Sequence, residues 1–296
     1  MVLGHRGVPK VHQENTIAGF RKALELGVEG VEFDVFKTKD DKIVVFHDES
    51  TERLTGFKGN IEEMTWDEVS KLRISRQIDM GDGQIVSYSS EEKIPLLEAV
   101  LDEFKGKLLM NIELKSFALK WSSRYAGKET ARTIRNTQAE DSVIITSFDP
   151  FKLYTLEKEY PGLHSGFAYD DGMTGDIGVW FNHLPEIQSE LAKAPGNQND
   201  VTFLNFICES DVIGKLLGST VVDAEYTLID IDTILKFHQK GMLIGSYTVF
   251  PLDTRFVKNS NSEEEQKQIL QRLVNLEVDW IETDDPEKAK YVLDKI

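Results

Sequence analysis

The sequence has a single cysteine, no long apolar run and little positive charge. Because Cys208 is the one cysteine among 296 residues, an intrachain disulfide and a cluster of thiolate metal ligands are both excluded. No stretch approaches the ~20 apolar residues of a membrane-spanning helix. With 34 basic against 51 acidic residues, the net charge of −17 argues against nucleic-acid binding and against docking on anionic membranes. We expect a soluble cytoplasmic protein, since no signal peptide precedes the strand expected at Val2.

Apolar runs alternate with amphipathic helical patterns along most of the chain. Because these runs are mostly apolar, they predict a parallel sheet covered by helices. The length suits a (β/α)8 TIM barrel, which typically has ~250 residues. An open doubly wound sheet is the alternative, but the sequence lacks the Gly-x-Gly-x-x-Gly turn that would support it. Strands are expected at 2–4, 30–35, 43–46, 108–114, 143–146, 163–168, 220–224, 243–249 and 278–282, and helices at 16–26, 97–104, 128–137, 151–159, 232–240, 263–276 and 286–293.

Residues 49–93 interrupt this alternation. They are polar, contain several turn-forming glycines and carry one expected helix, over 65–72, that begins with a capping box. We interpret this stretch as a small cap subdomain inserted at the mouth of the barrel, after the second strand region. The whole chain, 1–296, is then a single barrel domain.

A second irregular stretch, from about residue 170 to residue 200, carries Trp180 and Phe181 and one expected helix over 185–193. The two aromatic residues fit packing within a loop. The alternative is an apolar rim that contacts a lipid tail.

The strand expected over 30–35 alternates acidic and apolar side chains. Side chains alternate faces along a strand, so Glu32 and Asp34 share one face, with Cα atoms about 6.6 Å apart. Two carboxylates at that spacing can converge on one ion. The alternative is an edge strand with solvated acids, but the flanking apolar runs favour a covered central strand.

The strand expected over 108–114 repeats this arrangement. Glu113 and Lys115 share a face, and Glu113 would bring a third carboxylate to the same barrel mouth. Three carboxylates repel one another unless a cation lies among them, and an all-oxygen set favours Mg²⁺, Mn²⁺ or Ca²⁺ over Zn²⁺. The charge of Lys115 suits a phosphate oxygen, although Glu113 and Lys115 considered alone would form a structural ion pair.

Two histidines, His5 and His47, also lie at the ends of apolar runs. Imidazole exchanges protons near neutral pH, so the two can act as a general base and a general acid. Arg6 adds a planar donor fork that matches phosphate oxygens. Either histidine alone would more often be structural, and it is the combination that favours an active site. The remaining histidines are interpreted as structural, namely His12, His164, His183 and His238.

Together these motifs resemble the glycerophosphodiester phosphodiesterase family. The similarity covers nearly the whole chain and is most specific up to Lys115. Three features depart from the family pattern. Gln13 replaces a usual proline, residues 246–248 replace a strand that usually carries tryptophan, and the segment 167–200 is unusual in length. The matching segments are 4–7 (GHRG), 14–16 (ENT), 32–35 (EFDV), 39–41 (KDD), 44–48 (VVFHD), 53–56 (RLTG), Gly59, 94–98 (IPLLE), 113–115 (ELK), 147–149 (SFD) and 283–286 (TDDP).

The resemblance implies a TIM barrel with a small inserted subdomain and one divalent cation, Mg²⁺ or Ca²⁺, with Mn²⁺ as a further option. It implies hydrolysis of a small glycerophosphodiester to sn-glycerol 3-phosphate and an alcohol, which we expect to pass through a cyclic phosphate. The implied roles are metal binding by Glu32, Asp34 and Glu113, acid–base catalysis by His5 and His47, and phosphate binding by Arg6 and Lys115.

Two other functions fit the same residues. One is a phosphodiesterase of the lysophospholipase D type that acts on acylated lipids. The other is a non-catalytic phosphodiester binder on the same scaffold, which the complete set of reactive residues argues against. The sequence leaves open the alcohol, the native metal, the histidine that acts first as base, and the oligomeric state.

Overall fold

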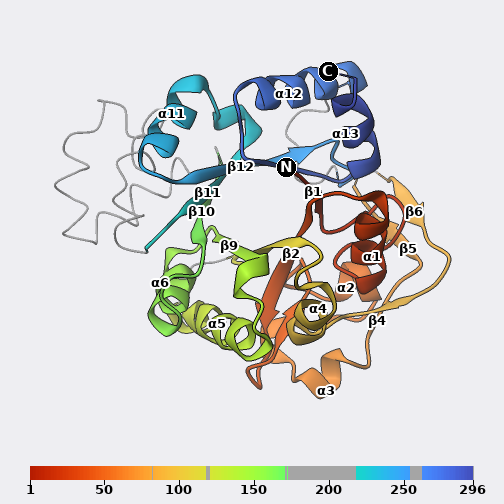
Figure 1. Cartoon of the computed structure of the whole chain (residues 1–296). Helices are drawn as coiled ribbons and strands as arrows, with labels where there is room; N and C mark the ends of the chain where they lie inside the picture. Colours follow the sequence, from red (N-terminus) through yellow and green to blue (C-terminus); the bar gives the residue numbers. More distant parts are fainter. Residues whose placement is uncertain (82, 118–120, 171, 173–217, 254–261, 296) are drawn as a thin grey trace.

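The computed structural model describes residues 1–81, 83–117, 121–170, 172, 218–253 and 262–295 (Figure 1). Within these residues, no helix is long and apolar enough to cross a membrane. Several features expected from the sequence lie outside the described residues, namely the helix over 185–193, Trp180, Phe181, His183 and Cys208.

Eight of the described strands form a closed parallel barrel. Strand β1 pairs with both β2 and β13, so the sheet closes on itself, and each neighbouring pair around the ring is parallel. This confirms the predicted TIM barrel. The barrel strands are β1 (Val2–His5), β2 (Gly30–Lys37), β8 (Leu109–Leu114), β9 (Val143–Ser147), β10 (Ser165–Tyr169), β11 (Val221–Glu225), β12 (Leu243–Val249) and β13 (Trp280–Thr283).

Helices cover the outside of the barrel (Figure 1). The outward side chains of β2, such as Phe33, pack against them, and the Phe20 ring of the first helix lies 5.2 Å from the Phe33 ring. That helix begins where Thr16 accepts a hydrogen bond from the Gly19 N–H and ends at Gly27, which has φ 67°. The covering helices are α1 (Ile17–Leu26), α4 (Leu97–Phe104), α5 (Tyr125–Thr137), α6 (Pro150–Glu159), α11 (Ile231–Gln239), α12 (Glu263–Asn275) and α13 (Pro286–Leu293), and the short 3-10 turns are η2 (Trp121–Arg124), η3 (Glu140–Ser142) and η5 (Tyr226–Leu228).

One strand departs from the expected parallel arrangement. β3 (Ile43–Val45) runs antiparallel to β2, with Val35 opposite Val45, and stays outside the parallel ring. The connection from β2 is a tight turn in which Asp41 has φ 61°. A parallel return needs a crossover of a dozen or more residues, so this short turn forces a hairpin.

The described residues of 49–93 lie on one side of the barrel, where Figure 1 shows α2, α3, β4, β5 and β6. Side chains from this stretch join Phe36, Val44 and Phe46 in a second apolar cluster that is separate from the main core. The helix expected over 65–72 is shorter than predicted and gives way to a strand, although the Thr65 N–H donates to Glu68 as its capping box requires, at 2.8 Å. The elements are α2 (Glu52–Thr55), η1 (Ile61–Glu63), α3 (Trp66–Val69), β4 (Arg73–Ile74), β5 (Gln77–Asp79), β6 (Ile85–Ser87) and β7 (Glu92–Lys93).

Candidate active site

Two neighbouring barrel strands bring three carboxylates together. β2 carries Glu32 and Asp34 on one face, and the parallel register places Asp34 opposite Glu113 of β8. Oxygen atoms of the three carboxylates lie within 4.8 Å of one another. Glu32 and Asp34 are only 2% and 1% exposed, so the alternative of a solvated edge strand is wrong. The predicted metal ligands therefore form one group.

This acidic group is short of positive charge. Burial, and then the charge of Asp34, raises the pKa of Glu32 well above its usual range. Burial also raises the pKa of Glu113. Burial alone would raise the pKa of Asp34, but the neighbouring Lys115 ammonium helps to hold that pKa well below its usual range. Because Glu32 Oε1 is buried without a hydrogen-bond partner, the group fits a hard divalent cation, which would satisfy that oxygen.

Lys115 lies beside two of these carboxylates. Its Nζ is 3.0 Å from Glu113 Oε1 and 3.2 Å from Asp34 Oδ1. The ion pair considered from the sequence is therefore present, with a second acid joined to it. Two residues further along, the half-exposed Phe117 ring stands 6.0 Å from the His47 ring and 5.8 Å from Lys115 Nζ. The site thus has one apolar wall.

His5 ends β1 and faces the acidic group. Its Nδ1 lies 2.6 Å from Asp284 Oδ1, and its Nε2 lies 3.8 Å from Glu32 Oε2. The second Asp284 oxygen accepts the Leu252 N–H at 2.5 Å, which fixes the carboxylate. One ring nitrogen of His5 is therefore oriented by an acid while the other points toward the predicted metal ligands.

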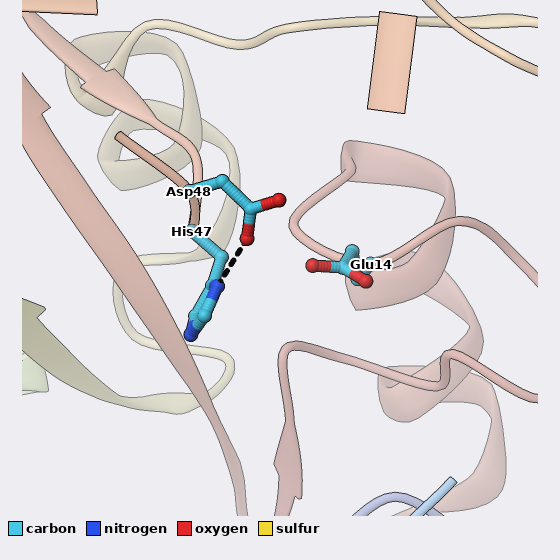
Figure 2. Close-up of side chains that lie close together, drawn as sticks. All are labelled: Glu14, His47 and Asp48. Carbon is cyan, nitrogen blue, oxygen red and sulfur yellow. Dashed lines mark hydrogen bonds and ion pairs between the residues drawn. The ribbon is translucent and has the colours of Figure 1, made fainter. Parts of the chain in front are cut away.

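His47 follows β3 and is almost fully buried. Its Nδ1 lies 2.6 Å from Asp48 Oδ1, and the other ring nitrogen points away from Asp48 (Figure 2). Burial, and then the charges of Arg6 and Lys115, lowers the pKa of His47 well below its usual range. The ring is therefore neutral at neutral pH, and a proton on Nδ1 would leave Nε2 as an acceptor.

Arg6 turns inward from a tight reversal after β1. The Gly7 N–H donates to Gly4 O at 3.0 Å, Arg6 itself has φ 54°, and a Cβ on Gly4 would lie 2.2 Å from Gly7 O. This reversal requires glycine at position 4 and buries the Arg6 side chain. The guanidinium lies 3.1 Å from Glu14, 3.4 Å from Asp253 and 3.5 Å from Asp34.

A polar layer lies beneath the site inside the barrel. Below it is an apolar layer that includes Ile144, Val221 and Trp280. The polar residues Asp223 and Glu282 lie two positions after Val221 and Trp280 on the same strands, so their side chains share a face with them. Asn111 donates to Asp223 at 3.3 Å and to Glu282 at 2.7 Å. Burial raises the pKa of Asp223 to about 8, so this layer holds protonated acid near neutral pH.

Among the charged residues of the site to which the sequence assigned no role are Asp284, which contacts His5, and Asp48, which contacts His47. Arg53 and Glu14 lie behind them. These four residues belong to segments that match the family pattern, so a signal existed. Strand-end reasoning does not reach Glu14, Asp48 and Arg53, which lie beyond the strand ends, whereas Asp284 directly follows β13.

Comparisons with known proteins agree with this geometry. The model of the Glycerophosphoryl diester phosphodiesterase family matches residues 5–288. A glycerophosphodiester phosphodiesterase of Bacillus altitudinis is 29% identical over 292 residues, covering 97% of this chain and 96% of the relative. The crystal structure of a glycerophosphodiester phosphodiesterase from Parabacteroides distasonis has a TM-score of 0.68 at 21% identity, covering 99% of this chain and 96% of that one. An Oleispira antarctica phosphodiesterase, solved with its product sn-glycerol-3-phosphate, has a TM-score of 0.66 at 18% identity, covering 99% and 96%.

The family match and the similarity to glycerophosphodiester phosphodiesterases identify an enzyme of the phosphoric diester hydrolase class, and the barrel is the fold of its relatives. The chain belongs to the glycerophosphoryl diester phosphodiesterase family.

Proposed function

We propose that the protein hydrolyses a glycerophosphodiester to sn-glycerol 3-phosphate and an alcohol, in a metal-dependent reaction that passes through a cyclic phosphate. The observation that carries the proposal is the group of Glu32, Asp34 and Glu113, whose oxygens lie within 4.8 Å of one another. His5 Nε2 lies 3.8 Å from Glu32, and His47 is near enough for its charge to act on Asp34. The donor set of the three carboxylates fits Mg²⁺ or Ca²⁺. When bound there, a divalent cation would supply positive charge that offsets the negative charge of the reacting phosphoryl group.

The two histidines would move the protons. His47, kept neutral by burial, would accept the proton of the glycerol hydroxyl next to the phosphate through Nε2. The oxygen of that hydroxyl would attack phosphorus, and the alcohol would leave with a proton from His5, which Asp284 orients. Water would then open the cyclic phosphate with the two roles reversed.

Arg6 and Lys115 would hold the phosphate oxygens. Arg6 is buried, the Lys115 side chain is only 13% exposed, and both cations contact carboxylates, so their positions would be fixed before substrate binds. This arrangement would also allow a protein of net charge −17 to bind an anionic substrate.

A substrate that lacks the attacking hydroxyl tests this reaction. We expect an intact glycerophosphodiester to be turned over at least ~10³-fold faster than its analogue without the hydroxyl next to the phosphate, since an intramolecular nucleophile has a very high effective concentration. Phosphorus-31 NMR would follow both reactions and reveal the cyclic phosphate. The analogue should still bind, as a competitive inhibitor, and comparable turnover of the two compounds would contradict the cyclic route.

The same assay separates the two alternatives. The exposed Phe117 ring beside His47 is the observation that favours an acylated substrate. Faster turnover of lysophosphatidylcholine than of glycerophosphocholine would support the lysophospholipase D reading. Binding of both compounds without turnover, with either metal present, would support a non-catalytic binder.

We also propose that residues 49–93 form a cap subdomain within a single barrel domain. Support comes from the separate apolar cluster of this stretch and from its hydrogen bonds to the loop after β1. The Gln13 side-chain amide donates to Ser75 O at 3.2 Å and to Ser90 O at 2.6 Å, and the Tyr88 hydroxyl donates to Pro9 O at 2.6 Å. Gln13, where the family usually has proline, would thus fasten the cap over the loop that carries Arg6.

Loosening these contacts should weaken substrate binding. The double variant Gln13→Ala with Tyr88→Phe removes three hydrogen bonds, each worth about 1 kcal/mol, and we expect KM to rise several-fold with a smaller change in kcat. Steady-state kinetics would measure both constants, with the exposed Glu91→Gln as the matched control in the same stretch. An unchanged KM in a folded double variant would exclude the cap role.

A further inference from the structure

Arg53 joins two acids at the edge of the site. It lies on α2, the first helix of the 49–93 stretch. Its Nη1 and Nη2 donate to the two oxygens of Glu14 at 2.9 and 2.7 Å, and its Nε and Nη2 donate to the two oxygens of Asp48 at 2.5 and 3.0 Å. Both carboxylates are thus held in the bidentate fashion that only the planar guanidinium fork provides.

The two acids held by Arg53 each contact a residue of the active site. Asp48 Oδ1, which accepts from Arg53, is the atom that lies 2.6 Å from His47 Nδ1. Glu14 Oε1, which also accepts from Arg53, lies 3.1 Å from Arg6 Nη1. A continuous set of contacts therefore runs from His47 through Arg53 to Arg6, all in side chains that are at most 16% exposed.

The same atoms could be read as a second metal site. Ligand atoms of Glu14, His47 and Asp48 lie within 4.8 Å of one another, and Figure 2 shows the Glu14 and Asp48 carboxylates on the same side of the histidine. However, Arg53 already bonds to both oxygens of both acids. The Arg53 guanidinium therefore already supplies the positive charge that a metal ion would bring to these two acids.

We propose that Arg53 is a positioning residue for the reaction, which fixes the Asp48 carboxylate so that it orients the His47 ring and leaves Nε2 toward the substrate. This inference rests on the proposed acid–base role of His47. If Arg53 is removed, Asp48 loses this bidentate contact and is held less firmly, so the His47 ring can adopt the other tautomer or another orientation. Binding of the phosphate by Lys115 and by a cation on the acidic group would remain.

The variants Arg53→Ala and Arg53→Lys test the proposal. We expect kcat to fall about 10–100-fold in Arg53→Ala, the usual cost of losing an outer partner of a reactive histidine, with KM within a few-fold of wild type. Arg53→Lys keeps the charge without the fork and should lose an intermediate amount. Added guanidinium salt should restore part of the activity of Arg53→Ala. The control is Arg73→Ala, which removes an exposed arginine of the same stretch that donates to the Ser70 and Leu72 carbonyls, and its kinetics should be unchanged.

Nitrogen-15 NMR of labelled histidine gives a readout that is independent of turnover. In the wild type we expect His47 to show one neutral tautomer protonated on Nδ1, and in both Arg53 variants a mixture of tautomers or a shifted Nδ1 signal. An unchanged His47 spectrum, or wild-type kcat in folded Arg53→Lys, would overturn the proposal. If the protein turns over no glycerophosphodiester at all, the proposed function fails while the spectra still decide whether Arg53 orients His47.

Discussion

Replacement of His47 by alanine is expected to lower kcat by about 10²–10⁴-fold without loss of the fold, the range for removal of a general base. In the wild type, the rate should fall on the acidic side only well below pH 6.5, because burial lowers the pKa of His47 and the base is active when neutral. Steady-state kinetics across pH, with circular dichroism to verify folding, would measure both effects. His238→Ala is the matched control, since that ring contacts Asp279 at 2.9 Å on the outside of the barrel.

His5→Ala should lower kcat by a similar factor when the substrate's leaving group is an ordinary alcohol. The loss should be smaller when the leaving group is p-nitrophenolate, which departs without a proton. The His47 variant should lose the same factor with both substrates, because its proton comes from the attacking hydroxyl. The opposite pattern would show that His5 is the base and His47 the acid. Near-wild-type kcat in either variant would refute the acid–base assignment.

Removal of the metal is the second change expected to have a large effect. Chelation should lower activity by at least ~10³-fold, since a bound cation supplies several kcal/mol of charge stabilisation, and Mg²⁺ or Ca²⁺ should restore it. Metal binding should stabilise the wild type by ~2.7 kcal/mol when the metal concentration is 100 times Kd, and this should raise the melting temperature. Glu32→Gln and Glu113→Gln should lose most activity and also this rise in melting temperature.

The same variants should behave differently without metal. The pKa of Glu32 is raised in the folded protein, so its ionisation opposes folding, and its contribution to stability is lost as the pH rises above the usual carboxyl range. Metal-free Glu32→Gln should therefore melt a few degrees higher than metal-free wild type at pH 8. In a domain of this size, a change of ~1 kcal/mol in the free energy of unfolding shifts the melting temperature by about 2–4 °C. At pH 5 the difference should shrink.

A surface variant such as Glu91→Gln should leave both melting curves unchanged. A fully active preparation without metal, or a Glu32→Gln variant that still shows the metal-induced rise in melting temperature, would contradict the site of Glu32, Asp34 and Glu113.

The alternation of apolar runs with helical patterns, together with the family resemblance, predicted the barrel, and period-two patterns predicted the place of the acidic group. Glu32 and Asp34 share a face because they are two residues apart, and Glu113 joins them because parallel strands present their ends at one edge. The same logic placed His5 and Lys115, which end or follow barrel strands.

Loop contacts were beyond this reasoning. The two bidentate partners of Arg53 are Asp48, five residues away, and Glu14, 39 residues away, and only three-dimensional packing brings Glu14 to Arg53. The direction of β3 was also missed, because its apolar run reads like a barrel strand although the preceding turn is too short for a crossover.

The closure of the barrel has a consequence for when the enzyme becomes active during synthesis. His5 comes from the first strand of the ring and Asp284 directly follows the last, 279 residues away. β2 and β8, which carry the acidic group, are synthesised long before β13, and until β13 has been made His5 lacks its orienting carboxylate. The proton donation that we propose for His5 is thus coupled to the final strand, so partly made chains should be poor hydrolases.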